Sequence, residues 1–209
     1  MKKTIGIILR EYTSDYKDVK LYGFRQDLVP FLRKYDINVI SIPVMFRNEN
    51  EFDKVKEIVD FCDAIIFPGG SEMYNIDYKI IKYLYEMDKP TLGVCLGFQI
   101  MAKAFNGKDR VLIESGNHAS EEEYVHNVTI KKDSLLYKII GEENIKVNSR
   151  HTKKVPYTEL DCVAYSDDGI LEAVEAKDKK FFIGTQWHPE SLLNDVNSKR
   201  FFDYFIASL

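Results

Sequence analysis

The sequence predicts a doubly wound α/β fold, in which a mostly parallel sheet carries helices on both faces and an antiparallel extension at one edge. Short apolar runs alternate with segments of helical spacing in the first half of the chain, and the second half changes to short strands separated by brief turns. A turn signal, Pro68-Gly69-Gly70, stands directly after one of the apolar runs. The 209 residues and the 45% hydrophobic share suit a substantial core, so residues 1–209 are expected to form a single domain.

The first half of the chain contains four short apolar runs that are typical of strands. Between them, helical spacing predicts helices over residues 19–35, 51–61 and 76–87, and a further helix begins at Gly97. Pro30 interrupts the first of these helices, since proline removes a backbone donor. Short apolar strands that alternate with helices favour parallel pairing. The expected strands cover residues 4–9, 38–42, 64–67 and 91–94.

The second half predicts the antiparallel extension at the edge of the sheet. Its short alternating runs are separated by turns such as Asp167-Asp168-Gly169. The aromatic-rich final segment, residues 197–209, predicts a closing helix that packs on the sheet. The expected strands cover residues 126–130, 145–148, 162–166, 171–176 and 181–186, with a short helix over residues 134–140.

Charge and hydropathy disfavour two classes of partner. The net charge is −4 and the lysines are scattered among acidic residues, which disfavours binding to nucleic acid. No apolar run approaches the length of a membrane span. The first apolar run is short and stops at Arg10, which predicts a buried strand and not a signal peptide. We therefore expect neither a nucleic-acid partner nor a membrane.

Cysteine and histidine usage predicts a cytoplasmic protein without a cofactor. Cys62, Cys95 and Cys162 are an odd number of cysteines with no close pairing, which suits a reducing compartment. No two histidines or cysteines have the spacing of metal ligands. A Gly-x-Gly-x-x-Gly or Walker-type loop for a nucleotide cofactor is also absent from the sequence. The expectation is no metal and no cofactor.

Cys95 stands between two glycines at the end of an apolar run, in the segment Gly93-Val94-Cys95-Leu96-Gly97. A nucleophile on a sharp turn between a strand and a helix needs a strained backbone. The residues two positions away on each side then come too close to tolerate a Cβ. The start of a helix would also stabilise a thiolate. The pattern alone fits both a reactive thiol and a buried core cysteine.

A cysteine nucleophile needs a histidine to accept and return its proton, and the histidine needs a third group to orient it. Among the four histidines, His188 lies at the end of an expected strand, in the segment Trp187-His188-Pro189-Glu190. An extended backbone would point His188 and Glu190 to the same side, with Pro189 stiffening the spacer. His-Pro-Glu alone also fits a surface turn. The order Cys, His, Glu on an α/β sheet favours a catalytic triad of Cys95, His188 and Glu190.

Three segments together resemble the class I glutamine amidotransferase superfamily. The resemblance implies a flavodoxin-like sheet and hydrolysis of a γ-glutamyl amide through a γ-glutamyl thioester on Cys95. It implies that His188 is the general base and acid, with Glu190 as its partner. The backbone N–H groups of Gly70 and Leu96 would form the oxyanion hole, although a glycine pair alone also fits an ordinary turn. The three segments are Gly93-Val94-Cys95-Leu96-Gly97-Phe98-Gln99, Trp187-His188-Pro189-Glu190 and Pro68-Gly69-Gly70.

Val147-Asn148-Ser149-Arg150-His151 resembles the Val-Asn-Ser-x-His segment of the γ-glutamyl hydrolase branch, which includes γ-glutamyl-γ-aminobutyrate hydrolases. The resemblance implies that Asn148, Ser149, Arg150 and His151 line the site of the glutamyl head group. Arg150 is an available cation for its carboxylate, and Gln99, one helical turn after Cys95, could reach the same group. His151 also fits a loop histidine without a ligand. The implied partner is a small γ-glutamyl substrate, bound by a monomer or homodimer.

The chain departs from this branch after His151, where Thr152-Lys153-Lys154 stands in place of a glutamine. Lys153 and Lys154, with Arg47 and Arg110 on other candidate rim loops, would suit an anionic leaving group such as a phosphate. Short bacterial relatives hydrolyse γ-glutamyl-CDP-amidate and release a cytidine diphosphoramidate for capsule decoration, so this compound is one candidate substrate. A γ-glutamyl amine is another. Lysines in a loop are often only solvated.

Two other functions compete with the hydrolase. The first is a glutaminase subunit that delivers ammonia to a synthetase partner. The second is a degenerate member of the fold that serves as a binding module. A decayed site would be expected to have lost Cys95, His188 or Glu190, and all three are present.

Overall fold

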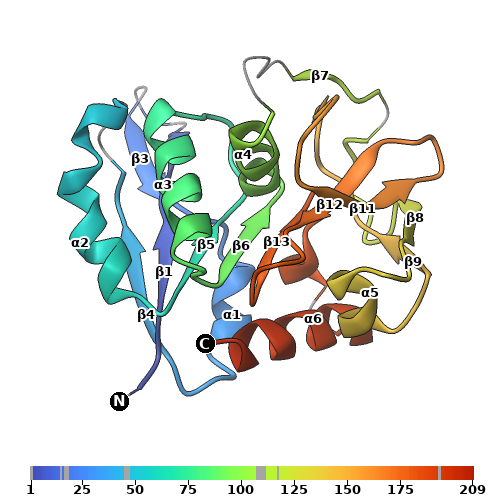
Figure 1. The fold of residues 1–209 in the computed structure, drawn as a ribbon. Coiled ribbons are helices and arrows are strands. Elements are labelled where there is room, and N and C mark those ends of the chain that lie inside the picture. The colour runs from blue at the N-terminus through green and yellow to red at the C-terminus, as the bar shows by residue number, and fades with distance from the viewer. Residues whose placement is uncertain are drawn as a thin grey trace.

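The computed structural model describes residues 2–14, 16, 19–44, 48–106, 112–116, 118–192 and 194–209. Its centre is a nine-stranded sheet with the strand order β4-β1-β5-β6-β13-β12-β11-β8-β9 (Figure 1). The first five strands in this order pair in parallel, and the remaining pairs are antiparallel. The expected α/β sheet, mostly parallel with an antiparallel edge, is therefore confirmed. The strands are β4 (Asn38–Ile42), β1 (Thr4–Ile8), β5 (Ala64–Phe67), β6 (Thr91–Val94), β13 (Phe182–Thr185), β12 (Leu171–Glu175), β11 (Asp161–Ser166), β8 (His126–Ile130) and β9 (Asn144–Val147).

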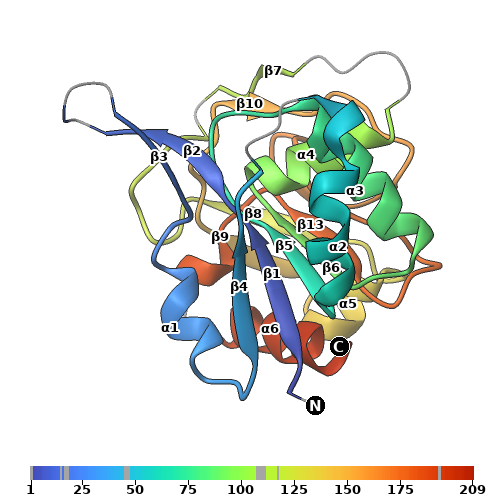
Figure 2. The same cartoon turned by 90° about the vertical axis from the view of Figure 1, so that its left-hand side faces the viewer.

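Helices cover both faces of the sheet (Figure 2). Successive residues of a strand point to opposite faces, and β1 shows this directly. Ile7 packs into the core beneath α1 and α6, whereas Ile8 packs into the core beneath α2, α3 and α4. One face carries α2 (Asp53–Phe61), α3 (Asn75–Glu86) and α4 (Leu96–Ala104), and the other carries α1 (Leu28–Leu32), α5 (Leu135–Ile140) and α6 (Val196–Ala207).

The predicted helix over residues 19–35 is wrong in its first half. Lys20–Gly23 form strand β3, which pairs antiparallel with β2 (Arg10–Thr13) in a separate two-stranded sheet. The physical reason is that Leu21, the first apolar position of the predicted helical face, is 51% exposed and does not face the core. Its helical spacing relative to Leu28, Phe31 and Leu32 therefore does not reflect a shared buried face.

The strand expected at residues 181–186 exists as β13, but it does not belong to the antiparallel extension alone. It pairs in parallel with β6 on one side and antiparallel with β12 on the other. This strand is therefore the junction between the two parts of the sheet. A further two-stranded sheet, β7 (Ile113–Glu114) with β10 (Lys153–Lys154), has no counterpart in the prediction.

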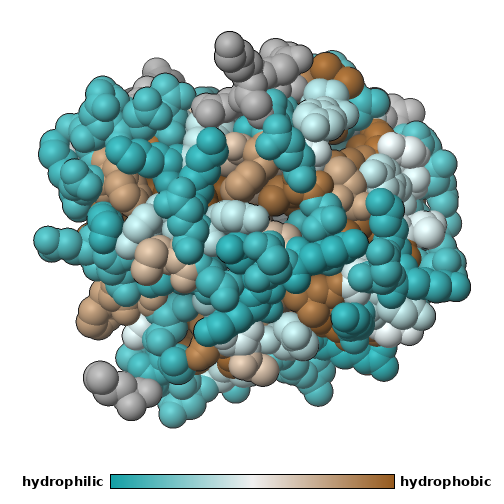
Figure 3. All heavy atoms as spheres, viewed as in Figure 1, coloured by the Kyte–Doolittle hydropathy of each residue, from teal (hydrophilic) through white to brown (hydrophobic). Residues whose placement is uncertain are grey.

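Most of the face seen in Figure 1 is covered by hydrophilic side chains (Figure 3). Within the ranges that the structure describes, no helix combines the length and the apolar character needed to cross a bilayer.

Candidate active site

Cys95 occupies the turn between β6 and α4, at the carboxyl end of the parallel strands. Its φ of 50° and ψ of −98° lie outside the regions that residues with a side chain ordinarily adopt. The Cys95 N–H donates to the carbonyl of Thr185 in β13 at 2.8 Å, and the Cys95 carbonyl accepts from the Gln99 N–H at 3.0 Å. Strain of this kind persists only where the surrounding structure enforces it, and it is concentrated at functional sites.

Gly93 and Gly97 permit this turn because their surroundings leave no room for a Cβ. A Cβ on Gly97 would overlap the carbonyl oxygen of Phe67 and would lie 2.8 Å from its carbonyl carbon. A Cβ on Gly93 would overlap the sulfur of Met101 and would lie 2.7 Å from the carbonyl carbon of Gly97. This is the close approach that the glycine spacing predicts.

His188 and Glu190 follow β13, and a short helix, η2 (Pro189–Ser191), brings them together. The sequence predicts an extended backbone here, and the structure has a 3₁₀ turn in its place. Pro189 suits the first position of that turn, where its missing N–H leaves no bond unmade. The turn places Nδ1 of His188 2.7 Å from Oε1 of Glu190, and both side chains are buried. A carboxylate in this position holds the imidazole in one orientation.

Cys95 also acts on the His188 imidazole, as the pKa of that ring shows. Burial alone would lower the pKa of His188, but the charge of Glu190 and the hydrogen bonds to Cys95 and Glu190 outweigh it and raise that pKa to about 10. The ring therefore carries a proton at neutral pH. An imidazolium beside the sulfur of Cys95 can give that proton to a departing amine.

Gly69 and Gly70 follow β5 and pack over the same turn. A Cβ on Gly69 would lie 2.9 Å from Cε1 of His188 and 3.7 Å from Cβ of Cys95. A Cβ on Gly70 would lie 3.0 Å from a side-chain carbon of Leu96. Leu96 begins α4, so its backbone N–H has no acceptor within its own helix. The structure thus brings the two residues of the expected oxyanion hole together beside Cys95.

Two residues of β2 hold the glycine pair, and no sequence signal marks either of them. Arg10 is 1% exposed, and its Nη1 donates to Oδ2 of Asp77 at 2.9 Å. The stem of Arg10 lies against Gly70, 3.0 Å from where a Cβ would stand. The hydroxyl of Tyr12 donates to the carbonyl of Gly69 at 3.2 Å. Both contacts join segments far apart in the chain, which explains why local patterns miss them.

Asn148 clamps the backbone of His188. Its Nδ2 donates to the His188 carbonyl at 2.9 Å, and its Oδ1 accepts from the His188 N–H at 2.8 Å. The hydroxyl of Ser149 donates to the carbonyl of His118 at 2.5 Å. Both side chains are buried and bonded to backbone groups. Direct contact of either with a substrate stays a prediction, and the structure adds a positioning role for Asn148.

Gln99 and His151 are also buried and bonded within the protein. The Gln99 amide donates to the carbonyl of Lys153 at 3.1 Å and to the side-chain oxygen of Gln186 at 3.0 Å. Nδ1 of His151 donates to the same Lys153 carbonyl at 3.0 Å, and its Nε2 lies 3.1 Å from Nδ1 of His118. Their predicted contacts with a glutamyl group are likewise untested.

Arg150 belongs to a polar cluster next to Glu190. Its Nη1 donates to the hydroxyl of Ser191 at 2.8 Å, and that hydroxyl donates to Oδ2 of Asp27 at 2.7 Å. Burial alone would raise the pKa of Asp27, but the hydrogen bond from Ser191 and the charge of Arg25 lower it. Among the described residues, Nε of Arg150 is buried without a hydrogen-bond partner. This donor is available to an anion.

The structure describes two of the four cationic residues expected at the rim of the site. Lys153 and Lys154 form β10, and the ammonium of Lys153 pairs with the carboxylate of Glu114 across the β7–β10 sheet. That ion pair reduces the positive charge that Lys153 could offer to an anionic leaving group. Arg47 and Arg110 lie outside the described residues.

The sequence profile of the Peptidase C26 family matches residues 72–190. Among curated relatives, the CTP synthase of Thermosipho africanus is 32% identical over 180 residues, which cover 66% of this chain and 34% of that protein. A glutamine amidotransferase-like protein of Lactococcus lactis is 24% identical over 214 residues, which cover 87% of this chain and 86% of that protein. The chain spans about a third of the length of the CTP synthases that it matches.

The fold is also similar to a solved structure, the glutaminase domain of Trypanosoma brucei CTPS with bound acivicin. The TM-score is 0.71 at 18% sequence identity, and the match covers 99% of this chain and 93% of that chain. At this level of identity the similarity concerns the fold.

Proposed function

This chain belongs to the Peptidase C26 family of glutamine amidotransferase-like proteins, and from that premise we propose that it hydrolyses the γ-glutamyl amide bond of a small substrate. The observation that carries the proposal is the arrangement of Cys95, His188 and Glu190. A strained cysteine meets a buried imidazole that is held by a carboxylate 2.7 Å away. Such a constellation serves nucleophilic attack on an acyl carbon.

In the proposed reaction, Cys95 attacks the γ-carbonyl carbon as a thiolate, because His188 already holds the proton of the pair, and the carbonyl oxygen takes up negative charge. The backbone N–H groups of Leu96 and Gly70 stabilise that oxyanion. The His188 imidazolium then protonates the leaving amine, the C–N bond breaks, and a γ-glutamyl thioester remains on Cys95. His188, now neutral, takes a proton from water, which attacks the thioester. The tetrahedral intermediate then expels the Cys95 thiolate, glutamate leaves, and the thiolate–imidazolium pair is restored.

The leaving group that we propose is either an amine or a CDP-amidate. An anionic leaving group gains support from Lys154, whereas Lys153 is paired with Glu114. The assay that separates these substrates uses γ-glutamyl-γ-aminobutyrate, γ-glutamyl-CDP-amidate and glutamine, with glutamate release as the measurement. Glutamate release from either of the first two by the isolated protein supports the hydrolase. No glutamate release from any of the three overturns it.

The second candidate function is a glutaminase that passes ammonia to a synthetase. The observation that favours it is the similarity to CTP synthases, of which this chain spans about a third. In the same assay, glutamine would then be the best substrate, and its hydrolysis would rise when the partner is added.

Arg150→Ala is expected to raise KM for the γ-glutamyl substrate by about 10-fold or more with a smaller change in kcat. We propose that Arg150 binds the α-carboxylate, because its Nε is a buried donor without a partner in the described part of the chain. A charge-assisted hydrogen bond is worth about 1.5–3 kcal/mol, or about 10- to 100-fold in affinity. Steady-state kinetics measure the effect. Arg33 is exposed, so Arg33→Ala serves as the matched control. Equal KM values for the two variants would show that Arg150 does not bind the substrate.

Glu190→Gln is expected to move the alkaline limb of the pH profile of kcat/KM to lower pH. In the wild type, the raised pKa of His188 keeps the imidazolium available for the leaving amine until about pH 10. The charge of Glu190 raises this pKa, so its removal lets the ring lose its proton at a lower pH. Activity should therefore fall earlier as pH rises. The exposed Glu159→Gln makes the same chemical change and should leave the limb in place.

A further inference from the structure

Three histidines and one glutamate converge on a single point next to the candidate active site. His118 precedes β8, His126 begins β8, His151 follows β9, and Glu172 lies in β12. One possible ligand atom from each of the four lies within 4.8 Å of the other three. Local sequence spacing does not reveal this group, because the fold assembles it from four separate segments.

Hydrogen bonds on the far side of each ring fix which nitrogen faces the cluster. Nδ1 of His151 is 3.0 Å from the carbonyl of Lys153, and Nδ1 of His126 is 3.2 Å from the carbonyl of Asn127. A carbonyl only accepts, so both of these nitrogens carry the proton. Nε2 of His118 is 3.0 Å from a carboxylate oxygen of Asp168, and it donates for the same reason.

With one proton on each ring, these bonds leave three bare nitrogens directed at one another and at the Glu172 carboxylate. Both oxygens of Glu172 are fully buried, and neither has a hydrogen-bond partner among the described residues. Nε2 of His126 is buried and unpartnered in the same part of the chain. A buried carboxylate surrounded by acceptors is strongly unfavourable unless a cation compensates it.

Four of the six distances among these atoms match the edges of a tetrahedral metal site, and all four atoms lie within 4.8 Å of one another. Oε1 of Glu172 lies 3.4 Å from Nδ1 of His118, 3.6 Å from Nε2 of His126 and 3.5 Å from Nε2 of His151. The two nitrogens of His118 and His151 are 3.1 Å apart. A tetrahedron with bonds of about 2.0–2.1 Å, the lengths found at zinc, has edges of about 3.3 Å.

We propose that His118, His126, His151 and Glu172 form a structural Zn²⁺ site. Three imidazoles and one carboxylate supply four ligands. A coordination number of four is typical of structural zinc. Each histidine is oriented by an outer hydrogen bond, as metal-bound histidines are. The His126 side chain is 15% exposed and offers a path for the ion to enter. This assignment departs from the expectation of no metal, which considered local spacing alone.

Two of the proposed metal ligands, His151 and Glu172, belong to segments that also hold the backbone around His188. His151 stands three residues after Asn148, whose side chain clamps the backbone of His188. The carbonyl of Glu172 accepts from the Gln186 N–H at 2.7 Å, two residues before His188. Bound zinc would therefore fix the two segments that position His188.

The test measures metal binding in the Cys95→Ala variant, because the thiol of Cys95 could bind zinc by itself. Tag-free protein is stripped with a chelator, reconstituted with Zn²⁺ and assayed for metal content by mass spectrometry. One equivalent of zinc is expected. Reconstitution with Co²⁺ should give the intense visible absorption of a tetrahedral site, without a thiolate charge-transfer band. Zinc content near zero after reconstitution overturns the proposal and leaves protonated histidines as the counter-charge.

Variants locate the bound metal. Glu172→Gln and His126→Gln should each weaken Zn²⁺ binding by at least about 100-fold in a chelator competition, since loss of only an outer hydrogen-bond partner costs about 10- to 100-fold. Full zinc affinity in both variants overturns the proposal. The exposed Glu123→Gln is the control for the change from carboxylate to amide.

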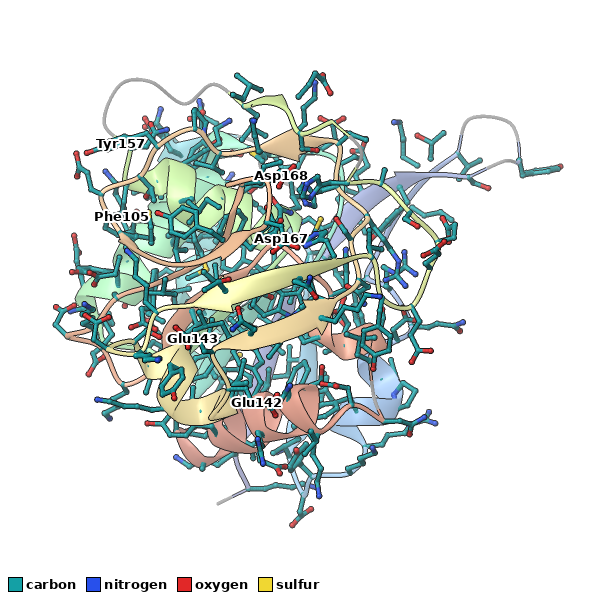
Figure 4. All side chains as sticks on the ribbon, turned by 90° about the vertical axis from the view of Figure 1, so that its right-hand side faces the viewer. Phe105, Glu142, Glu143, Tyr157, Asp167 and Asp168 are labelled. Atoms are coloured by element: carbon teal, nitrogen blue, oxygen red, sulfur yellow. The ribbon has the colours of Figure 1, made fainter. Side chains whose placement is uncertain are left out.

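A second pair of variants avoids the buried core, so that misfolding does not obscure the result. Asp168 and Asp167 lie in the turn between β11 and β12 (Figure 4). Asp168 orients His118, whereas Asp167 accepts from the side chain of Asn127 at 3.0 Å. Asp168→Asn should weaken Zn²⁺ binding by about 10- to 100-fold, and Asp167→Asn should leave it unchanged. Equal affinities in the two variants count against the site.

Discussion

Cys95→Ala is expected to reduce kcat for γ-glutamyl hydrolysis by at least about 10⁴-fold, since loss of a nucleophile removes the covalent route. The backbone N–H groups of Leu96 and Gly70 would remain and could still bind the substrate carbonyl. Alanine keeps the Cβ of Cys95, so the packing against Gly69 is retained. The thermal unfolding midpoint should therefore change little while turnover disappears.

The measurement is glutamate release over a long incubation, with circular dichroism to show that the fold is intact. Mass spectrometry of the wild type during turnover should detect a γ-glutamyl adduct on the peptide that contains Cys95. Cys162→Ala is the matched control, because Cys162 is a partly buried thiol whose sulfur donates to the carbonyl of Leu160. Wild-type turnover in Cys95→Ala would show that another group attacks the substrate.

The strands of the parallel core could be predicted from the sequence almost residue by residue. Ala64–Phe67 and Thr91–Val94 are fully buried runs with turn residues at their ends. Burial on both faces requires an unbroken apolar run, and the turn residues mark its limits. His126–Ile130 was also predicted with its observed bounds, because its alternating pattern reflects one buried and one exposed face.

The hairpin of β2 and β3 and the parallel pairing of β13 could not be predicted in the same way. Leu21 and Tyr22 are apolar by type but exposed in the fold, so composition alone assigns them to the wrong side. The direction in which Phe182–Thr185 pairs depends on which strand lies beside it, and β6 is distant in the chain. Neither fact is encoded in local periodicity.

The residues of the candidate site also fall into two groups, those that short motifs predict and those that they do not. Cys95, His188 and Glu190 lie in short motifs, and the structure brings them together, with a hydrogen bond between His188 and Glu190. Arg10, Tyr12 and the partners of Glu172 act across long sequence separations. The role of Asn148 illustrates the difference, because the motif predicts a substrate contact and the structure shows a bond to the His188 backbone.

Gly97→Ala is expected to destabilise the protein by about 3 kcal/mol or more, the upper range for an added methyl group that the surroundings cannot accommodate. The new Cβ would overlap the carbonyl oxygen of Phe67 and lie 2.8 Å from both its carbonyl carbon and its Cβ. These atoms belong largely to the backbone of β5, a central strand paired on both sides, so no side-chain rotation relieves the overlap. Either β5 or α4 must move.

Movement of α4 would also displace Cys95 and Leu96, which lie at its N-terminus, so soluble Gly97→Ala protein should lose activity together with stability. Urea denaturation measures the free energy of unfolding. Gly23→Ala is the control, because no described residue lies within 4 Å of a Cβ added there, and its effect should stay within about 0.5 kcal/mol. Equal stability of the two variants would mean that β5 and α4 do not approach as closely as the structure places them. The strained turn at Cys95 would then lack the packing that enforces it.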